Sequence, residues 1–225
     1  MTMHREVLTQ SIHKRPVEAW RLTQGPVNLL LMAGVHGDEP EGYYLIERYV
    51  KDELWKDLEG RATLWVIPRL NPDGCAEKTR GNGNGVDLNR NMPTQDWSPI
   101  AAKPRYNPGS KAASEPETLA LMSFIERIQP RVIFSAHSWQ PMINYNGPCQ
   151  KLAEYMSQLN GYRISDDIGY PTPGSLGTWS GWERKIPTIT LEIEEESSEE
   201  TIWSTHAEAL KKALIYAATH EDLNQ

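Results

Sequence analysis

His36 and Glu39 lie three residues apart, in a glycine-containing stretch that directly follows an apolar run. The apolar run, residues 28–33, has the length and composition of a buried strand. Zinc accepts imidazole nitrogen and carboxylate oxygen, and a catalytic zinc site has three protein ligands and one position open for water. The pattern therefore predicts two ligands of a zinc site, with a third ligand and a general base elsewhere in the chain.

Two later apolar segments carry residues that could complete this site. His137 follows residues 131–136, and Glu192 lies within residues 187–193. Ligands of α/β proteins collect at the carboxyl ends of the strands, and a charged residue inside an apolar strand is costly unless it has a use. We therefore predict that His137 is the third zinc ligand and that Glu192 is the general base.

Residues 75–112 are rich in Gly, Asn and Pro and show little periodicity. An irregular segment of this length inside a compact domain is usually functional or disordered. This one contains Arg80 and, after a glycine-rich stretch, the sequence Asp87-Leu88-Asn89-Arg90-Asn91. The concentration of charged and amide side chains favours a functional loop.

Regular elements must hold these residues in place. Four segments are predicted to be buried strands, at residues 28–33, 62–68, 131–136 and 187–193. Segments with helical spacing lie among them, at residues 41–54, 114–130, 150–159 and 201–219. Buried strands separated by helices indicate a sheet that is covered on both faces. We predict a single α/β domain over residues 1–225, with a mixed, twisted sheet flanked by helices on both faces and an outer strand or two within residues 1–27.

Three local features are also predicted from the sequence. Asn71-Pro72-Asp73-Gly74 is a strong turn signal. Ser114 is expected to cap the helix that begins near Pro116. His206 has no partner at metal-ligand spacing, and we expect it to face solvent.

Composition excludes several classes of function. The chain has 225 residues and a net charge of −7, and its calculated pI of about 5.4 argues against a nucleic-acid partner. No stretch approaches the ~18 apolar residues of a membrane-spanning helix, and the N-terminus has no apolar leader segment. Two cysteines in a chain of this length make no disulfide framework. We expect a cytoplasmic protein that binds neither nucleic acid nor membrane.

Five motifs occur in an order that resembles the zinc carboxypeptidase family of carboxypeptidase A. They are His36-Gly37-Asp38-Glu39, Asn71-Pro72-Asp73-Gly74, Gly85-Val86-Asp87-Leu88-Asn89-Arg90-Asn91, Ser135-Ala136-His137-Ser138 and Thr190-Leu191-Glu192-Ile193. Each motif is weak by itself, but five in this order are specific. The resemblance covers roughly residues 28–195, which is most of the chain.

The resemblance implies a metal site and a base at defined positions. It implies that His36, Glu39 and His137 bind one zinc ion and that Glu192 is the base. Asp87 would orient the first zinc histidine, as the corresponding carboxylate does in the family. Partners of this kind are typically worth ~10–100-fold in metal affinity or activity.

The resemblance also implies how the substrate is held. Arg80 would polarise the scissile carbonyl and steady the oxyanion. Asn89 and Arg90 would hold the C-terminal carboxylate of the substrate, which a guanidinium binds through two parallel hydrogen bonds. Tyr170 would close over the substrate. These roles describe an exopeptidase that acts on a small peptide.

Within the family, the short length and residues 113–118 and 170–175 are similar to bacterial amidases that cleave the γ-D-glutamyl–diaminopimelate bond of cell-wall peptides. One alternative is a zinc deacylase of N-acyl amino acids, similar to aspartoacylase and succinylglutamate desuccinylase. Those enzymes share His-x-x-Glu, a later His and Asp-Leu-Asn-Arg, but Asn71-Pro72-Asp73-Gly74 and residues 170–174 favour the amidase. Another alternative is a metal-binding protein without turnover, which the presence of both Glu192 and Arg80 disfavours.

Overall fold

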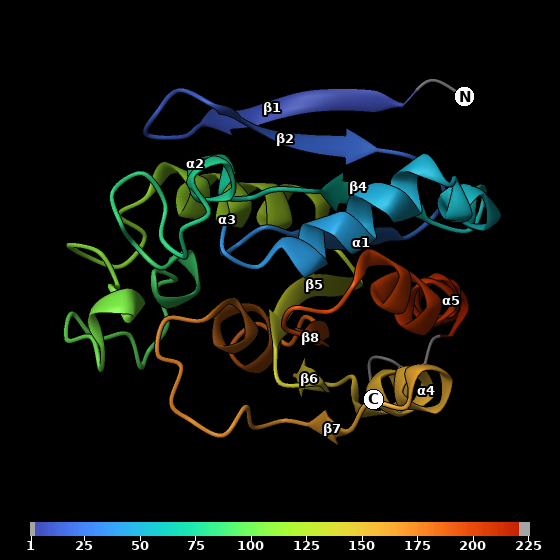
Figure 1. Cartoon of the computed structure of the whole chain (residues 1–225). Helices are drawn as coiled ribbons and strands as arrows, with labels where there is room; N and C mark the ends of the chain where they lie inside the picture. The colour runs from blue at the N-terminus through green and yellow to red at the C-terminus, as the bar shows by residue number, and fades with distance from the viewer. Residues whose placement is uncertain (1–2, 221–225) are drawn as a thin grey trace.

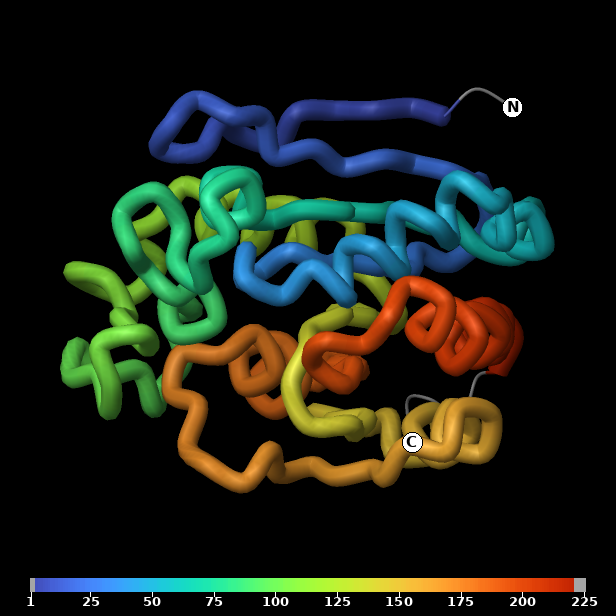
Figure 2. The backbone as a smooth tube through the Cα atoms, in the orientation of Figure 1, coloured from blue at the N-terminus to red at the C-terminus, as the bar shows by residue number. Residues whose placement is uncertain are grey.

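A computed structural model describes residues 3–220, and its strands form one mixed sheet (Figure 1). In the described residues the strands are β1 (His4–Gln10), β2 (Pro16–Arg21), β3 (Asn28–Ala33), β4 (Thr63–Ile67), β5 (Val132–Trp139), β6 (Met142–Asn146), β7 (Ile164–Ser165) and β8 (Thr188–Glu194). Their spatial order is β1-β2-β4-β3-β5-β8-β6-β7. The two N-terminal strands therefore lie at one edge of the molecule, and β6 and β7 lie at the opposite edge (Figure 2).

Five α-helices and four short helical turns connect the described strands. The α-helices are α1 (Pro40–Lys51), α2 (Pro72–Glu77), α3 (Pro116–Ile128), α4 (Gln150–Asn160) and α5 (Glu199–Thr219). The short turns are η1 (Leu54–Leu58), η2 (Leu88–Arg90), η3 (Pro104–Tyr106) and the π-helical η4 (Gly177–Trp182). No helix within residues 3–220 is long and apolar enough to cross a membrane.

The centre of the sheet is parallel and covered on both faces. Strands β4, β3, β5 and β8 pair in parallel, whereas β2 and β6 add to them in antiparallel fashion. Leu29 and Leu31 of β3 join the core formed with α1, α4 and α5, and Leu30 and Met32 join the core formed with α3. Successive side chains of a strand point to opposite faces, so burial on both sides explains why β3 is apolar throughout.

The predicted fold class is confirmed, and the four predicted strands all form. Strands β6 and β7 were not expected from the sequence. Polar Asn144 and Asn146 interrupt the apolar residues of β6, and this strand is fixed by antiparallel pairing with β8 rather than by its own pattern.

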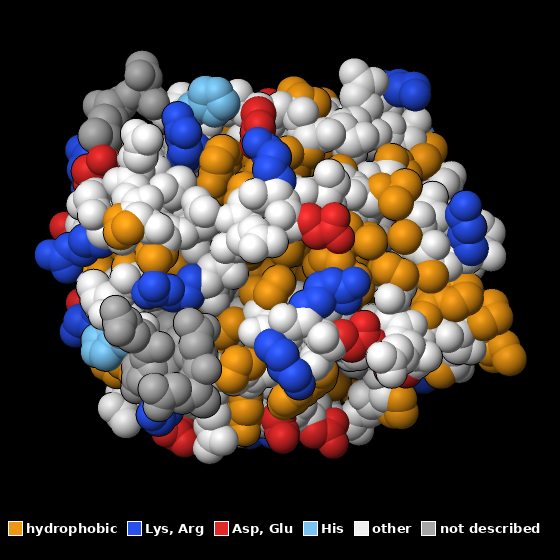
Figure 3. Space-filling view, turned by 180° about the vertical axis from the view of Figure 1, so that it is seen from behind, with side chains coloured by type: hydrophobic (Ala, Val, Ile, Leu, Met, Phe, Trp, Pro, Cys, Tyr) orange, Lys and Arg blue, Asp and Glu red, His pale blue; other side chains and the backbone are white. Residues whose placement is uncertain are grey.

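The surface opposite to the view of Figure 1 carries Lys and Arg side chains scattered among Asp and Glu, without a continuous basic stripe (Figure 3).

Three local predictions were wrong. The turn expected at residues 71–74 is the start of α2, where the Asn71 side chain caps the helix by accepting from Gly74 N at 2.8 Å. Helix α3 begins at Pro116 with Glu115 at the cap position, and Ser114 Oγ instead donates to Glu115 Oε1. His206 is buried, with 1% of its surface exposed.

Candidate metal centre and substrate cavity

The turn that carries His36 and Glu39 depends on glycine. Gly34, directly after β3, has a φ of +62°, in the region that favours glycine. Gly37 lies so close to α2 that a Cβ atom there would be 1.8 Å from the carbonyl carbon of Gly74. The backbone can therefore fold tightly over the end of β3, which places both side chains at the carboxyl edge of the sheet.

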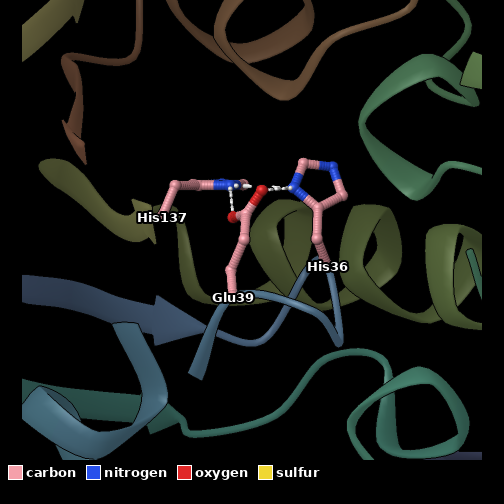
Figure 4. Close-up of side chains that lie close together, drawn as sticks. All are labelled: His36, Glu39 and His137. Carbon is pink, nitrogen blue, oxygen red and sulfur yellow. Dashed lines mark hydrogen bonds and ion pairs between the residues drawn. The ribbon is translucent and has the colours of Figure 1, made fainter. Parts of the chain in front are cut away.

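His36, Glu39 and His137 converge in the way that a metal site requires (Figure 4). Glu39 Oε1 is 2.7 Å from His36 Nδ1, and Glu39 Oε2 is 2.9 Å from His137 Nδ1. The two Nδ1 atoms are 3.2 Å apart. Two ligands about 2.05 Å from a tetrahedral zinc ion would be roughly 3.3 Å apart. The donor types and their spacing therefore fit one zinc ion.

The register of the sheet brings in the third ligand. Strand β5 pairs with β3 in parallel, with Ala136 opposite Ala33, so His137 lies one residue beyond the last β3 pair. Burial lowers the pKa of His137 and favours the neutral imidazole that a metal needs. Burial also acts to lower the pKa of His36, but the charges of Glu39 and Asp87 outweigh it and raise that pKa to about 9.

Asp87 lies beneath the site and is fully buried. Its Oδ1 is 3.0 Å from His36 Nε2 and accepts from Asn89 N at 2.9 Å, while its Oδ2 accepts from Arg80 Nε at 2.8 Å. Burial acts to raise the pKa of Asp87, but the charges of His36 and Arg80 hold that pKa well below its usual range. The ionised carboxylate fixes the His36 ring with Nδ1 facing the other ligands.

Glu192 lies beside the predicted metal ligands, on the neighbouring strand. It pairs in register with His137, because β5 and β8 run in parallel. Its side chain is buried and lines the same cavity as the ligands. Burial, together with the charge of Glu39, raises the pKa of Glu192 to about 8. A buried carboxyl group with a pKa near neutrality is suited to accept and return a proton.

Arg90 is a buried cation that forms no salt bridge in the described part of the chain, although its charge acts on Asp87. Its Nη1 donates to the Asn89 carbonyl at 2.7 Å, and its Nη2 is buried with no hydrogen-bond partner. Asn89 Oδ1 accepts from Leu176 N at 2.8 Å, and this fixes the amide group. A buried donor without a hydrogen-bond partner is costly, so the unpaired Nη2 group favours an anionic ligand at this point of the cavity wall.

Arg80 joins the metal site to the cavity. Besides its bond to Asp87, its Nη1 lies 3.2 Å from Glu39 Oε1. Tyr170 is half-buried, stacks on Tyr106 with ring centres 6.1 Å apart, and packs edge-on against Trp139 at 5.4 Å. Tyr170 lines the cavity, and its closing over a substrate stays a prediction.

One cavity of about 170 Å³ brings the predicted residues together. Its wall contains every predicted site residue except the underlying Asp87: His36, Glu39, Arg80, Asn89, Arg90, His137, Tyr170 and Glu192. The sequence interpretation missed Tyr106, Trp139 and Arg105, which also line it. The guanidinium carbons of Arg80 and Arg90 lie 5.3 and 5.0 Å from the Tyr106 ring centre. The available sequence signal for Tyr106 was an aromatic residue within the irregular segment of residues 75–112.

Comparison with known proteins agrees with this geometry. The family model described as zinc carboxypeptidase matches residues 2–159. The chain belongs to the zinc carboxypeptidase family. Murein peptide amidase A of Vibrio campbellii is 36% identical over 188 residues, covering 77% of this chain and 72% of that protein. The protein of the same name from Escherichia coli K12 is 35% identical over 183 residues, covering 76% and 73%.

Solved structures also resemble the fold of the chain. The murein-tripeptide amidase from Escherichia coli O157 has a TM-score of 0.79 at 29% identity, covering 93% of this chain and 91% of that one. Bovine thrombin-activatable fibrinolysis inhibitor also has a TM-score of 0.79, with 97% and 90% coverage, but its 18% identity supports the fold alone. The chain is therefore an enzyme of the metallopeptidase or amidase type.

Proposed function

We propose that this protein hydrolyses an amide bond next to a free C-terminal carboxylate, with one zinc ion, and that its substrate is a murein peptide containing γ-D-Glu–diaminopimelate. The observation that carries the proposal is Arg90. Its buried guanidinium has an Nη2 group without a partner and lines the same cavity as the metal-binding residues and Glu192. A substrate carboxylate held there places the preceding amide bond beside the metal site.

His36, Glu39 and His137 would hold the zinc ion. Zinc bound there supplies a Lewis acid that polarises the scissile carbonyl and lowers the pKa of water. Glu192 accepts the proton of the attacking water on a carboxylate oxygen and returns it to the leaving amine. Arg80 donates to the oxyanion from its guanidinium, a contribution of about 3 kcal/mol for donors of this kind.

Arg90 and Asn89 hold the carboxylate of the leaving residue, and Tyr170 covers it. An adjoining cavity of about 140 Å³ shares Asn89, Tyr170 and Glu192 with the catalytic cavity. Its wall also contains Asn144, Asn146, Asp166 and Asp167, and no Lys or Arg occurs among the described residues that line it. The side chain of a diaminopimelate leaving residue ends in an ammonium group and a carboxylate. The carboxylates of Asp166 and Asp167 suit the ammonium group, and the amide groups of Asn144 and Asn146 suit the carboxylate.

The relatives support the amidase over the N-acyl amino acid deacylase, since the similar proteins are named for murein peptides. The proposal keeps the cytoplasmic location that the sequence led us to expect. Glu192 and Arg80 line the same cavity as the three predicted metal ligands, and their presence there supports turnover over metal binding alone.

The test is release of free diaminopimelate from L-Ala-γ-D-Glu-diaminopimelate, with and without a chelator, together with measurement of bound metal per chain. An α-linked peptide and an N-acyl amino acid serve as comparison substrates. We expect chelator-sensitive release from the murein tripeptide and none from its C-terminal amide. Cleavage of the N-acyl amino acid alone would transfer the assignment to the deacylase, and no turnover by the zinc-loaded protein would overturn the proposal.

A further inference from the structure

Three arginines line the catalytic cavity, and the roles above use only two of them. Arg80 is paired with Asp87 and Glu39, and Arg90 faces the leaving carboxylate. The third, Arg105, comes from η3, and more than half of its side chain is exposed. Its one ion pair among the described residues joins Nη2 to Asp38 Oδ2 at 3.6 Å, which is too long for a hydrogen bond. The Arg105 guanidinium therefore keeps its donors available.

The position of Arg105 indicates which half of the substrate it meets. It lines the catalytic cavity and a second cavity of about 510 Å³, but not the cavity proposed for the leaving side chain. Arg90, Tyr106 and Trp139 have the same distribution. Arg105 differs from Arg90 in its neighbours, because Arg105 pairs with Asp38, between His36 and Glu39, whereas Arg90 contacts Asn89. With the leaving residue fixed by Asn89 and Arg90, the acyl half extends in the remaining direction, along Arg105.

The two flanking cavities have opposite charge. The leaving-residue cavity contains Asp166, Asp167 and Glu192, and its described wall holds no Lys or Arg. The larger cavity contains Arg90, Lys103 and Arg105, and no Asp or Glu occurs in its described wall. A substrate that complements both would carry an ammonium group on its leaving side chain, as diaminopimelate does beside its second carboxylate, and an anion on its acyl half.

A glutamate linked through its side chain satisfies the second requirement. When the γ-carboxyl group forms the amide bond, the α-carboxylate of the same residue stays free in the acyl half. An α-linked residue has no carboxylate at that place, since its α-carboxyl group is the one in the bond. We propose that Arg105 binds this free carboxylate and selects γ-linked over α-linked amides. The inference rests on the proposed function and specifies how the substrate is recognised.

The test compares two substrates that differ in one group. One is L-Ala-γ-D-Glu-diaminopimelate, and the other is the same peptide with the glutamate α-carboxylate replaced by a carboxamide. For the wild-type protein we expect kcat/KM to be ~10–100-fold higher for the carboxylate, the range for a hydrogen bond to a charged group. Because Arg105 is exposed, this preference should fall as salt is raised.

Two variants locate the preference. Arg105→Gln should lower kcat/KM for the carboxylate substrate much more than for the carboxamide, so that the two values become similar, with zinc still bound. Lys111→Gln removes an exposed cation from the same segment, outside all three cavities, and should keep the preference.

The outcomes separate this inference from the proposed function. Equal cleavage of both substrates by the wild-type protein would overturn the inference and leave the amidase assignment intact. An equal loss on both substrates in Arg105→Gln would show that Arg105 only shapes the loop, which also overturns it. No release of diaminopimelate from either substrate would overturn the proposed function and, with it, the inference.

Discussion

Replacing Asp87 by asparagine should weaken metal binding and turnover together. Asp87 is fully buried, and it holds His36, Arg80 and the Asn89 backbone through distances of 3.0, 2.8 and 2.9 Å. Asparagine has nearly the same shape, but one of its two polar ends is an NH₂ donor. In one orientation of the amide, that donor faces the N–H groups of His36 and Asn89, and in the other it faces the N–H group of Arg80. A donor then meets a donor in both orientations.

The magnitude follows from what each contact supports. Loss of the carboxylate partner of a metal-binding histidine costs ~10–100-fold in metal affinity. Arg80 also loses the partner that fixes its guanidinium, and removal of an oxyanion donor costs about 100–1,000-fold in kcat. Arg80 remains in the variant but is less well oriented. We therefore expect kcat of the zinc-saturated variant to fall ~100-fold, the lower end of the range for removal of an oxyanion donor.

The assay separates the two effects. Zinc affinity is measured by competition with a chelator of known affinity, and kcat is then measured at saturating zinc. Asp52→Asn is a matched control, because Asp52 is exposed at the opposite end of α1 from Glu39. Unchanged zinc affinity and unchanged kcat in a folded Asp87→Asn protein would refute the view that this carboxylate organises the site.

Three further predictions test other parts of the molecule. Glu192→Gln should bind zinc normally and lose nearly all turnover, measured as diaminopimelate release; turnover at the wild-type rate would exclude Glu192 as the base. Arg90→Lys should lower kcat/KM by ~10-fold or more for peptides with a free C-terminus, because Lys cannot form the paired hydrogen bonds; equal activity of the wild-type protein on C-terminally amidated peptides would contradict the carboxylate contact. Burial lowers the pKa of His206 to about 4 in the folded state, below the ordinary value of about 6.5, so the unfolded chain binds the extra proton between these values. The contribution of neutral His206 to the free energy of unfolding is complete above pH ~6.5 and is lost as the pH falls toward 4. Measured by urea unfolding, the free energy of unfolding should fall by about 2 kcal/mol more between pH 7 and pH 5 in the wild-type protein than in His206→Leu. Equal decreases in the two proteins would contradict this assignment.

The sequence by itself determined the central strands and the predicted site residues. Strand β3 is apolar along its whole length because helices cover both of its faces, and such a run is recognisable without a structure. His36 and Glu39 follow β3 closely, His137 lies near the end of β5, and Glu192 lies within β8. Parallel strands present these positions at one edge, so the order of the motifs predicted a common site.

Only the tertiary structure decided where the irregular segments lie. Strand β6 contains polar Asn144 and Asn146, and it becomes a strand through its antiparallel pairing with β8. The residues around His206 in the sequence are typical of a helix and do not indicate which way its side chain faces. His206 is buried because α5 packs it against the ring of Tyr162. These outcomes depend on contacts between residues distant in the chain, which local periodicity does not encode.

The same reason explains which site residues the sequence did not reveal. Arg105 and Tyr106 lie in a segment without regular spacing, and they reach the cavity because the segment folds back over Tyr170. Metal ligands are tied to strand ends by short connections, so their positions follow from the strands. Substrate-facing residues on long loops depend on how those loops pack, so the sequence determined the chemistry of the centre while the tertiary structure decided the surroundings that the substrate meets.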